Sequence, residues 1–556
     1  MSFVQAAPQL GNQYGDDRVL RGYLARVFAA EQHRAIAPQL ERMGALAGGE
    51  LYAQSLAERS LEPQLVQWDA WGNRVDRIEL TPLWQRAERI AAREGLIAIP
   101  HEAPLGHLSR VMQFALVYLF TPSTDVYACP LAMTDGAART LASSGNRELI
   151  ERALPHLTSR DPARFWTSGQ WMTEQIGGSD VALTETVARR GANGGWTLHG
   201  RKWFTSAIAS QMALTLARPE GAAPGGKGLA MFYLETRDEA GRPNGISIDR
   251  LKDKLGTRKL PTAELTLEGT RAVPVGELAN GVRAISTVLN ITRVWNAVAA
   301  ISTMRRGLAL ARAYAKQRVA FGAPLAQKPL HADTLASLQA EFEAGFHLTF
   351  FVIELLGRAE QGAASEQQQA LLRILTPIAK LTTGRQGVMV SSEVLEAFGG
   401  AGYVEDTGLP ALLRDAQVYS IWEGTTNVLA LDTLRAIAPT GLAPLTREIV
   451  SLLGKVKEPQ LVALSARVQA AIEAADAWLK ANAAGDGPTL EAGARRFALT
   501  LGRSTAAALL ASHAQWALDQ LKDRRAYAAA LRFGASGVNL LGDFDPALSA
   551  LLADDA

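Results

Sequence analysis

The character of the sequence changes three times along the chain, and this order of segments limits the folds open to it. Residues 1–164 are rich in Ala, Leu, Arg and Glu at helical spacing. Within them, Thr81 followed by Pro82 predicts the N-cap and first residue of a helix that continues over 83–92. Residues 165–281 instead contain short alternating or β-rich runs separated by Gly and Pro, which predict a strand-dominated domain.

The second half of the chain returns to helical patterns. Within 282–437, apolar residues recur at three- and four-residue steps from Val294 to Ala315, over about six turns. This spacing predicts one long amphipathic helix, typical of a helical bundle. Residues 438–444 contain Pro and Gly and predict a linker, and the rest of the chain is alanine-rich and helical again.

A chain of 556 residues is longer than one hydrophobic core usually supports, so about three or four domains are expected. The predicted fold is mainly α with a central β domain. An N-terminal helical domain precedes the β domain, and a helical bundle and a further C-terminal helical region follow it. The predicted boundaries are 1–164, 165–281, 282–437 and 438–556.

Composition excludes several classes of protein. The net charge of +2, from 57 basic and 55 acidic residues, argues against a dedicated nucleic-acid binder. The single cysteine excludes an internal disulfide and any cysteine-based metal site. Residues 1–13 lack the features of a signal peptide, and no uncharged apolar run reaches the ~18 residues of a membrane span. A soluble, cytoplasmic protein with no membrane partner is therefore expected.

The segment 420–427 is the most informative local motif. It places one carboxylate, Glu423, between Ile421 and Trp422 on one side and Gly424 on the other. A carboxylate beside two large apolar side chains is expected to be partly desolvated, as a general base near neutral pH requires. Gly424 would let a flat ligand come close. The ordinary alternative is a strand-end Glu that points at water.

Four other motifs accompany it, and each also has an ordinary structural interpretation. Residues 171–181 contain paired glycines that suit either a ligand-facing turn or a plain turn. Residues 202–206 offer aromatic and hydroxyl groups to a ligand, or form a half-buried strand. Arg318, in 314–322, could clamp a pyrophosphate or only favour a helix dipole. The glycines of 396–403 suit a helix C-cap or a close ligand.

Other known motifs are absent from the sequence. Residues 221–228 resemble a phosphate loop, but Gly228 replaces the required Ser or Thr. The sequence has no Rossmann fingerprint, no H-E-x-x-H motif and no G-x-S-x-G motif. Its eight histidines lack ligand spacing, so no metal site is expected.

Taken together and in this order, the motifs resemble the acyl-CoA dehydrogenase superfamily of flavoproteins. The resemblance is close over 165–435 and looser before it. It implies an N-terminal helical domain, a β-barrel-like middle domain and a four-helix bundle, with FAD at their junction.

The resemblance also implies roles for single residues. FAD would be contacted by Met172, Thr173, Gly178, Ser179, Trp203, Thr205, Ser206, Arg318, Phe321, Glu396, Ala397, Gly400, Thr425 and Asn427. Many members have Gln at the position of Glu396. The acyl-CoA would be contacted by Thr292, Arg293, Trp422 and Gly424.

Glu423 falls on the family's usual catalytic base. A minority of members place that base where this chain has Thr292, which strengthens the assignment to Glu423. The implied reaction is α,β-desaturation of an acyl-CoA, with the α-proton taken by Glu423 and a hydride passed to flavin N5. A backbone N–H at Glu423 and a ribityl hydroxyl of FAD would stabilise the enolate oxygen. Many members carry Tyr where Trp422 stands, so the indole is expected to narrow the choice of acyl group.

The C-terminal extension most resembles that of the adaptive-response (AidB-like) branch. In that branch it has been linked to binding double-stranded DNA and protecting it from alkylation, which is the alternative function for this chain. Residues 445–556 contain twelve basic and twelve acidic residues, however, so a structural or oligomer-forming role is favoured. Membrane association, as in very-long-chain dehydrogenases, ranks third. The expected partners are an acyl-CoA, an electron-transferring flavoprotein and further copies of the chain, in a homotetramer or homodimer. An oxidase that passes electrons to oxygen stays open as a further alternative.

Overall fold

The computed structural model of the chain describes residues 5–483, 487–542 and 545–554. It divides into two compact units, and each combines segments that are distant in sequence. The first, called the sheet unit below, contains Gly49–Pro104 and Phe120–Trp295. The second, called the bundle unit, contains Met1–Gly48, Leu105–Leu119 and Asn296–Ala556.

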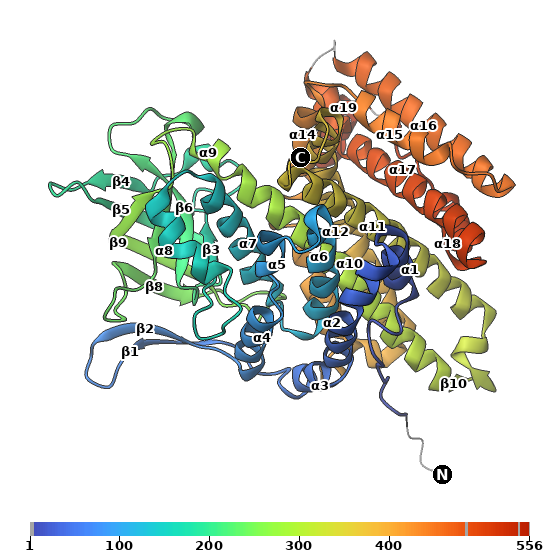
Figure 1. Cartoon of the computed structure of the whole chain (residues 1–556), viewed down its shortest axis with the longest axis horizontal. Coiled ribbons are helices and arrows are strands. Elements are labelled where there is room, and N and C mark those ends of the chain that lie inside the picture. The colour runs from blue at the N-terminus through green and yellow to red at the C-terminus, as the bar shows by residue number, and fades with distance from the viewer. Residues whose placement is uncertain (1–4, 484–486, 543–544, 555–556) are drawn as a thin grey trace. The chain divides into compact units, whose positions relative to one another are not determined.

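The sheet unit is built around a seven-stranded sheet (Figure 1). Its strands are β3 (Ser168–Trp171), β4 (Val187–Arg190), β5 (Trp196–Ser206), β6 (Met212–Pro219), β7 (Ala230–Glu235), β8 (Ile246–Leu251) and β9 (Thr262–Pro274). The order is β3-β6-β4-β5-β9-β7, with β8 on β9. Strand β6 pairs in parallel with β3 and β4, and the other pairs are antiparallel. Because β7 pairs with both β9 and β6, the sheet closes on itself, which confirms the predicted barrel-like middle domain.

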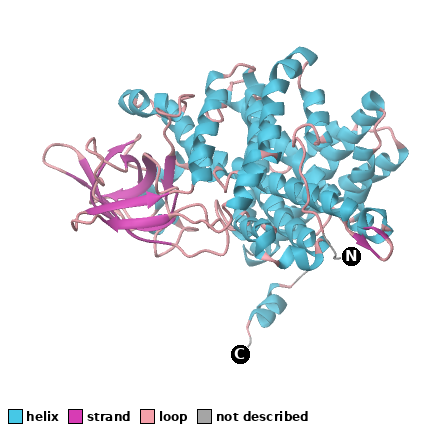
Figure 2. Cartoon of the chain, turned by 90° about the horizontal axis from the view of Figure 1, so that it is seen from below, coloured by secondary structure: helices cyan, strands magenta, loops and turns pink. Residues whose placement is uncertain are grey.

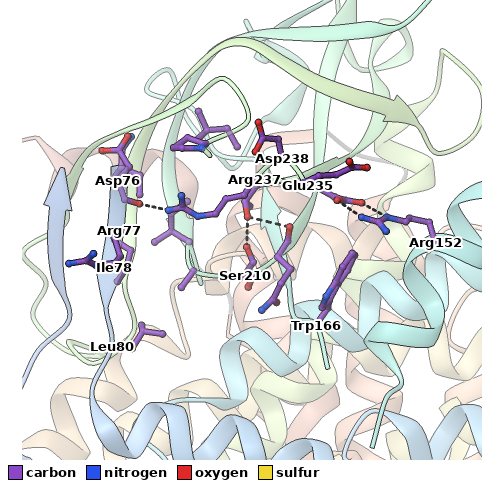
Figure 3. A pocket seen from close by; sticks show the side chains of 18 residues that line it. Asp76, Arg77, Ile78, Leu80, Arg152, Trp166, Ser210, Glu235, Arg237 and Asp238 are labelled. Atoms are coloured by element: carbon purple, nitrogen blue, oxygen red, sulfur yellow. Dashed lines mark hydrogen bonds and ion pairs between the residues drawn. The ribbon is translucent and has the colours of Figure 1, made fainter. Parts of the chain in front are cut away.

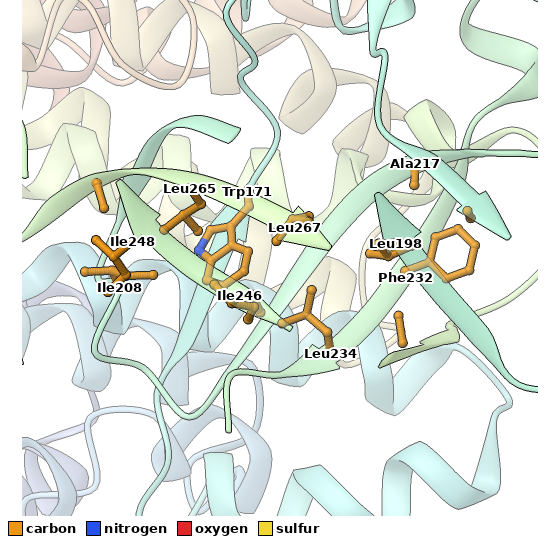
Figure 4. Packing of buried hydrophobic residues seen from close by; sticks show 14 of the residues in the cluster. Trp171, Leu198, Ile208, Ala217, Phe232, Leu234, Ile246, Ile248, Leu265 and Leu267 are labelled. Atoms are coloured by element: carbon orange, nitrogen blue, oxygen red, sulfur yellow. The ribbon is translucent and has the colours of Figure 1, made fainter. Parts of the chain in front are cut away.

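The side chains inside this sheet form one hydrophobic core of the unit (Figure 4). On β9, Ala263, Leu265 and Leu267 are buried while the residues between them are only partly buried, which is the two-residue period of a strand. Trp171 of β3 and Phe232 of β7 are fully buried in the same cluster. Burying a large apolar side chain stabilises a fold by about 1.5–3 kcal/mol, so this core holds the strands in register.

Helices complete this unit. They are α3 (Glu50–Ala57), α4 (Pro82–Arg93), α5 (Ala98–Glu102), α7 (Ala128–Ser143), α8 (Arg147–Leu157) and α9 (Gly281–Ala284). Two of them, α7 and α9, pack against the sheet at β3 and β7. The predicted start of α4 is confirmed, because the Thr81 hydroxyl accepts a hydrogen bond of 3.3 Å from the backbone N–H of Trp84. Pro82 is the first helical residue.

A β-hairpin of β1 (Gln64–Trp68) and β2 (Arg74–Glu79) also belongs to the sheet unit. The sequence pattern predicts only helices for this segment. Both strands are largely half-exposed, so they lack the apolar alternation that would predict them. The side chains of Gln67 and Arg74 each donate a hydrogen bond of 2.9 Å to the carbonyl of Ile248, which fastens the hairpin to β8.

The bundle unit is almost entirely helical (Figure 2). Its helices before the extension are α1 (Arg18–Val27), α2 (Ala30–Gly48), α6 (Ser109–Phe120), α10 (Ser286–Gln317), α11 (Pro329–Glu360), α12 (Glu366–Ala397), α13 (Pro410–Val418) and α14 (Thr426–Ile437). Helix α10 begins in the sheet unit and continues into the bundle unit. It confirms the long helix predicted around 294–315. Helices α10, α11 and α12 have 32 residues each.

One helix in the described part of the chain is long and apolar enough to cross a membrane. This is the stretch Gly281–Gln317, which includes α10, and 67% of its most apolar window is buried inside the protein. Core helices of globular proteins pass the same test of length and hydropathy.

The extension continues the bundle with α15 (Ala443–Leu453), α16 (Pro459–Ala483), α17 (Gly487–Leu521), α18 (Arg525–Ala535) and α19 (Pro546–Ala553). Helix α17 packs against α11, α12, α14 and α16. Its close approach to α12 requires Gly502, because a Cβ there would lie 2.2 Å from the Thr382 hydroxyl. Arg503 of α17 also forms an ion pair of 3.0 Å with Glu341 of α11. The extension is thus an integral part of this helical unit.

Candidate active site

Glu423 lies in the short connection between α13 and α14, called the base loop below (residues 419–425). Its backbone has a φ of +56°, which a non-glycine residue rarely adopts, and Gly424 follows with a φ of +100°. Thr425 ends the loop as the N-cap of α14, since its hydroxyl accepts a hydrogen bond of 3.3 Å from the N–H of Val428. Glu423 itself is half-buried.

Two buried polar side chains from neighbouring helices hold the base loop. Asn296 of α10 donates from Nδ2 to the Tyr419 carbonyl at 3.1 Å, and its Oδ1 accepts a hydrogen bond from the indole N–H of Trp422. Lys380 of α12 is fully buried and donates a hydrogen bond of 2.6 Å to the Gly424 carbonyl. Contacts on both sides of Glu423 therefore fix its strained backbone.

The tyrosine at the start of the base loop is anchored as well. Tyr419 is buried, and burial raises the pKa of its hydroxyl far above the ordinary value. That hydroxyl lies 3.0 Å from the Thr303 hydroxyl of α10. Tyr419 packs with Ala299, Ala300 and Ala416, and Trp422 packs against the edge of this cluster. The small alanines leave room for the two aromatic rings.

The other predicted residues of the bundle unit fall into two groups. Arg318 and Phe321 follow the end of α10, where β10 (Val319–Ala320) and β11 (Ala323–Pro324) form a short hairpin. Glu396 and Ala397 are the last residues of α12, and Gly400 lies in the short 3-10 helix Gly399–Tyr403 that follows it. The ring of Tyr314 on α10 contacts that of Phe398 at 4.7 Å, so the ends of the two helices lie together.

The second group lies at the start of α14. Thr425 caps that helix, and the side-chain oxygen of Asn427 accepts a hydrogen bond of 3.3 Å from Arg495 of α17. Lys380, which contacts the base loop, precedes Glu396 by 16 positions on α12. At a rise of 1.5 Å per residue, the two groups are separated by about 24 Å along that helix. The bundle unit thus presents two separate patches of predicted site residues.

The sheet unit brings together the two motifs predicted to lie along the flavin. Met172, Thr173, Gly178 and Ser179 follow β3, while Trp203, Thr205 and Ser206 lie on β5. The backbone N–H of Trp203 donates a hydrogen bond of 2.9 Å to the Thr173 carbonyl. A Cβ on Gly178 would lie 2.4 Å from the Thr173 hydroxyl, so this turn needs glycine.

A buried ion pair ties these two motifs together. Lys202 Nζ lies 2.7 Å from Glu174 Oε1, and both side chains are almost completely buried. Burial alone would raise the pKa of Glu174, but the charge and hydrogen bond of Lys202 and a hydrogen bond from Thr186 outweigh it and lower that pKa. Lys202 also donates to the Leu216 carbonyl at 2.9 Å. The pair fixes the turn after β3 against β5.

The hydroxyl and aromatic groups of β5 have protein partners of their own. The Thr205 hydroxyl donates to the Ala263 carbonyl, and the Ser206 hydroxyl lies 3.1 Å from that of Thr262. The ammonium group of Lys252 lies 3.5 Å from the centre of the Trp203 ring. One face of the indole therefore carries a cation.

The predicted substrate residues are placed on α10 and in the base loop. Thr292 is buried, and its hydroxyl donates a hydrogen bond of 3.1 Å to the Leu289 carbonyl one turn earlier. Arg293 is half-buried and lies beside Thr292 on the same helix. Trp422 and Gly424 flank Glu423. The indole of Trp422 donates to Asn296, and the carbonyl of Gly424 accepts from Lys380, as described above.

Sequence reasoning missed four residues that organise these motifs, namely Asn296, Lys380, Glu174 and Lys202. Lys380 carried a detectable signal, because it stands among the apolar residues Ile378, Ala379 and Leu381 of a long helix. A lysine at such a position is almost never fully buried without a partner. Asn296 carried no such local signal.

A cavity of about 470 Å³ lies elsewhere in the sheet unit, beside the β1–β2 hairpin (Figure 3). The described residues that line it include no member of the predicted site. Arg152 forms hydrogen bonds of 2.7 and 2.8 Å with Glu235, and Arg237 donates to the Asp76 carbonyl at 2.8 Å. These cations already have protein partners, so the cavity does not present a ready site for an anionic group.

Four family models match successive stretches of the chain. The AidB N-terminal domain model matches residues 6–162, and the acyl-CoA dehydrogenase middle and C-terminal domain models match 169–270 and 279–438. An acyl-CoA dehydrogenase 11 C-terminal domain-like model matches 442–537.

Similar proteins extend over most of the chain. Acyl-CoA dehydrogenase family member 11 of Caenorhabditis elegans is 42% identical over 528 residues, which are 92% of this chain and 86% of the relative. AidB of Escherichia coli is 31% identical over 383 residues, 67% of this chain and 69% of the relative. The crystal structure of Caenorhabditis elegans ACDH-11 in complex with C11-CoA has a TM-score of 0.94 and 39% identity, over 99% of this chain and 96% of that one. The resemblance inferred from the motifs is therefore confirmed, and the chain is an oxidoreductase that belongs to the acyl-CoA dehydrogenase family, with an AidB-type N-terminal domain and an ACDH-11-type C-terminal domain.

Proposed function

We propose that the protein is an FAD-dependent acyl-CoA dehydrogenase that forms an α,β double bond in an acyl-CoA thioester, with Glu423 as base. The left-handed backbone of Glu423 is the observation that carries this proposal. Such a conformation costs about 1–3 kcal/mol and persists where its surroundings enforce it, which is common at active sites. Asn296 and Lys380 supply that enforcement from two helices.

The chemistry requires a base and a hydrogen-bond donor. The Glu423 carboxylate would take the α-proton, and the backbone N–H of Glu423 would donate to the thioester oxygen as negative charge develops on it. Trp422, the preceding residue, would wall the acyl group and exclude water from the base. FAD, when bound, supplies the acceptor for the β-hydrogen, which leaves as a hydride.

Candidate FAD contacts are proposed within each unit, taken by itself. In the sheet unit these are Met172, Thr173, Gly178, Ser179, Trp203, Thr205 and Ser206, and in the bundle unit Arg318, Phe321, Glu396, Ala397, Gly400, Thr425 and Asn427. Two observations of the structure fit a flat, partly apolar ligand. The glycine turn at Gly178 lies close against Thr173, and the Phe321 ring is 97% exposed. Exposed apolar surface of this kind is typical of a binding surface.

The substrate and partners follow from the same proposal. Thr292, Arg293, Trp422 and Gly424 would contact the acyl-CoA, and the ACDH-11 complex with C11-CoA supports an acyl-CoA as ligand. An electron-transferring flavoprotein is proposed as electron acceptor. A homo-oligomer, tetramer or dimer, is proposed because the exposed Phe321 and Tyr403 rings would gain cover from another copy. A cytoplasmic location remains part of the proposal.

Anaerobic titration of the purified protein with acyl-CoAs of increasing length tests this function. A substrate should bleach the flavin absorbance of the wild-type protein, and Glu423→Gln should abolish the bleaching while FAD stays bound. Glu366→Gln, which changes an exposed carboxylate on α12, is the matched control and should bleach like wild type. Undiminished bleaching of Glu423→Gln would reject Glu423 as the base, and no bleaching of wild type by any acyl-CoA would reject the function.

A further inference from the structure

Asn296 uses both ends of its side-chain amide on the base loop. Its Nδ2 donates to the Tyr419 carbonyl at 3.1 Å, and its Oδ1 accepts the indole N–H of Trp422. The side chain is buried, with 4% of its surface exposed. A buried amide whose donor and acceptor are both engaged has one orientation, because a flipped amide would place like groups against each other.

The contact with Asn296 is also the directional restraint on the Trp422 ring. The indole packs against the small side chains of Ala299, Ala300 and Ala416 and lies 6.4 Å from the Tyr419 ring, centre to centre. Packing on alanines is non-directional and would permit the ring to tilt. The hydrogen bond from the indole N–H fixes the edge of the ring, and hence its tilt.

The place of Trp422 in the chain decides which part of a substrate it would meet. Trp422 directly precedes Glu423, and consecutive Cα atoms lie about 3.8 Å apart. On the proposed function, an acyl group that brings its α-carbon to Glu423 would therefore pass close to Trp422.

We propose that Asn296 is a positioning residue for substrate selection, which holds the Trp422 indole so that acyl groups branched at the α-carbon are disfavoured against straight ones. This inference rests on the proposed function and deepens it. Asn296 does not touch the substrate. It acts through Trp422 by limiting the room beside the reacting carbon.

The test compares a straight acyl-CoA, chosen as the best substrate of the wild-type enzyme, with its 2-methyl derivative. The measured quantity is the ratio of kcat/KM for the branched over the straight substrate. The variants are Asn296→Ala, Trp422→Phe and the double variant, each as the full-length flavoprotein. Thr303→Val is the matched control, because it removes the hydroxyl contact with Tyr419 from the same helix and leaves the indole contact intact.

Asn296→Ala should raise the ratio about tenfold, the scale on which one methyl group is discriminated in an apolar pocket. Trp422→Phe, which removes the indole N–H, should raise it as well. Adding Asn296→Ala to Trp422→Phe should then change the ratio little, because the residue through which Asn296 acts is already altered. Thr303→Val should keep the wild-type ratio.

A purely structural role would lower kcat/KM for both substrates equally and leave the ratio unchanged, and that result would overturn the inference. An undiminished effect of Asn296→Ala in the Trp422→Phe background would overturn it too. If Asn296→Ala fails to fold, Trp422→Phe breaks the same contact from the other side, and an unchanged ratio there decides against the inference. Failure of the proposed function is distinguishable, because wild type would then turn over neither substrate.

Discussion

The ammonium group of Lys380 donates a hydrogen bond of 2.6 Å to the carbonyl oxygen of Gly424, the residue that follows Glu423. The side chain of Lys380 is fully buried, and burial of a charged group without compensation is costly. A buried lysine that contacts the backbone beside the proposed base links the position of α12 to that of Glu423.

Lys380→Met should lower kcat about 100-fold, since displacement of a catalytic group by about 1 Å can cost that much. The Gly424 carbonyl would lose its hydrogen-bond donor, and the base loop would then be free to shift. FAD content should stay close to wild type, because none of the proposed cofactor residues is changed. Lys455→Met, at an exposed lysine of the bundle unit, is the control for loss of a positive charge. Steady-state kinetics measure kcat for each variant. An unchanged kcat in Lys380→Met would show that the contact does not position Glu423.

Lys202→Met should destabilise the protein by about 3–5 kcal/mol, because it leaves the buried Glu174 carboxylate without its cation. The exposed pair of Lys480 and Asp476 offers a matched control, and Lys480→Met should cost less than about 1 kcal/mol. Urea unfolding of the variants measures both values. Equal losses for the two variants would contradict the special role of the buried pair.

The same ion pair should give the protein an acid-sensitive stability. The pKa of Glu174 in the folded protein is lowered from its ordinary 4.5. The ion pair therefore contributes fully to the free energy of unfolding above pH 4.5, and this contribution is lost as the pH falls through the pKa of the folded protein. Unfolding free energies measured between pH 6 and pH 3 should therefore decrease less steeply for Glu174→Gln than for wild type. Parallel curves would contradict this assignment.

The sequence predicted those features that depend on local patterns. The start of α4 at Thr81 and Pro82, the long helix α10 and the alternation on β9 each follow from spacing within about a dozen residues. The order of the motifs along the chain was sufficient to identify the family. The β1–β2 hairpin was not predictable from alternation, because side chains such as Gln67 and Arg74, which fasten it to β8, are polar.

The sequence singled out Glu423, whose role as base stays a prediction, but it did not indicate the contacts that surround this residue. Nothing in the sequence near Asn296 indicates that its amide meets Tyr419, 123 positions later in the chain. That contact depends on how α10 packs against the base loop. Lys380 could have been noticed as a charge within an apolar helix face, although its target, the Gly424 carbonyl, is also set by tertiary packing.

The buried histidines of the bundle unit should make its stability fall below neutral pH. Burial, together with the charges of Arg26 and Arg18, lowers the pKa of His513 to about 3. Burial likewise lowers that of His347 well below 6.5, and the two rings lie 4.4 Å apart. Below pH 6.5 the unfolded chain binds protons at these two histidines and the folded chain does not. Each histidine therefore lowers the free energy of unfolding by up to about 1.4 kcal/mol for each pH unit that the pH falls.

His513→Phe should therefore reduce the loss of Tm between pH 7 and pH 5. The variant keeps an aromatic ring against Trp516, which stacks on His513 in the wild-type protein. His199→Gln, at a half-buried histidine of β5, is the control for removal of a histidine elsewhere in the chain. Thermal unfolding followed by circular dichroism measures the effect. An equally large loss of Tm in His513→Phe would show that other groups cause the acid sensitivity.

DNA binding by the extension is the last alternative, and the structure gives a physical reason to expect none. Its twelve basic residues are balanced by twelve acidic ones. Two of the basic residues, Arg503 and Arg532, form ion pairs with Glu341 and Asp333 of α11 within the fold. Affinity for duplex DNA requires several cations free to neutralise phosphates, and that affinity falls steeply with salt.

The full-length protein should therefore cause no salt-sensitive shift of a duplex oligonucleotide in low-salt buffer. Changing Arg524 and Arg525 to Ala, next to Lys522 in the densest basic cluster of the extension, should leave the electrophoretic result unchanged. A shift that disappears at higher salt and is weakened by these two changes would contradict the structural role. In that case the charge cluster at 522–525, and not the overall balance of the extension, would govern its interactions.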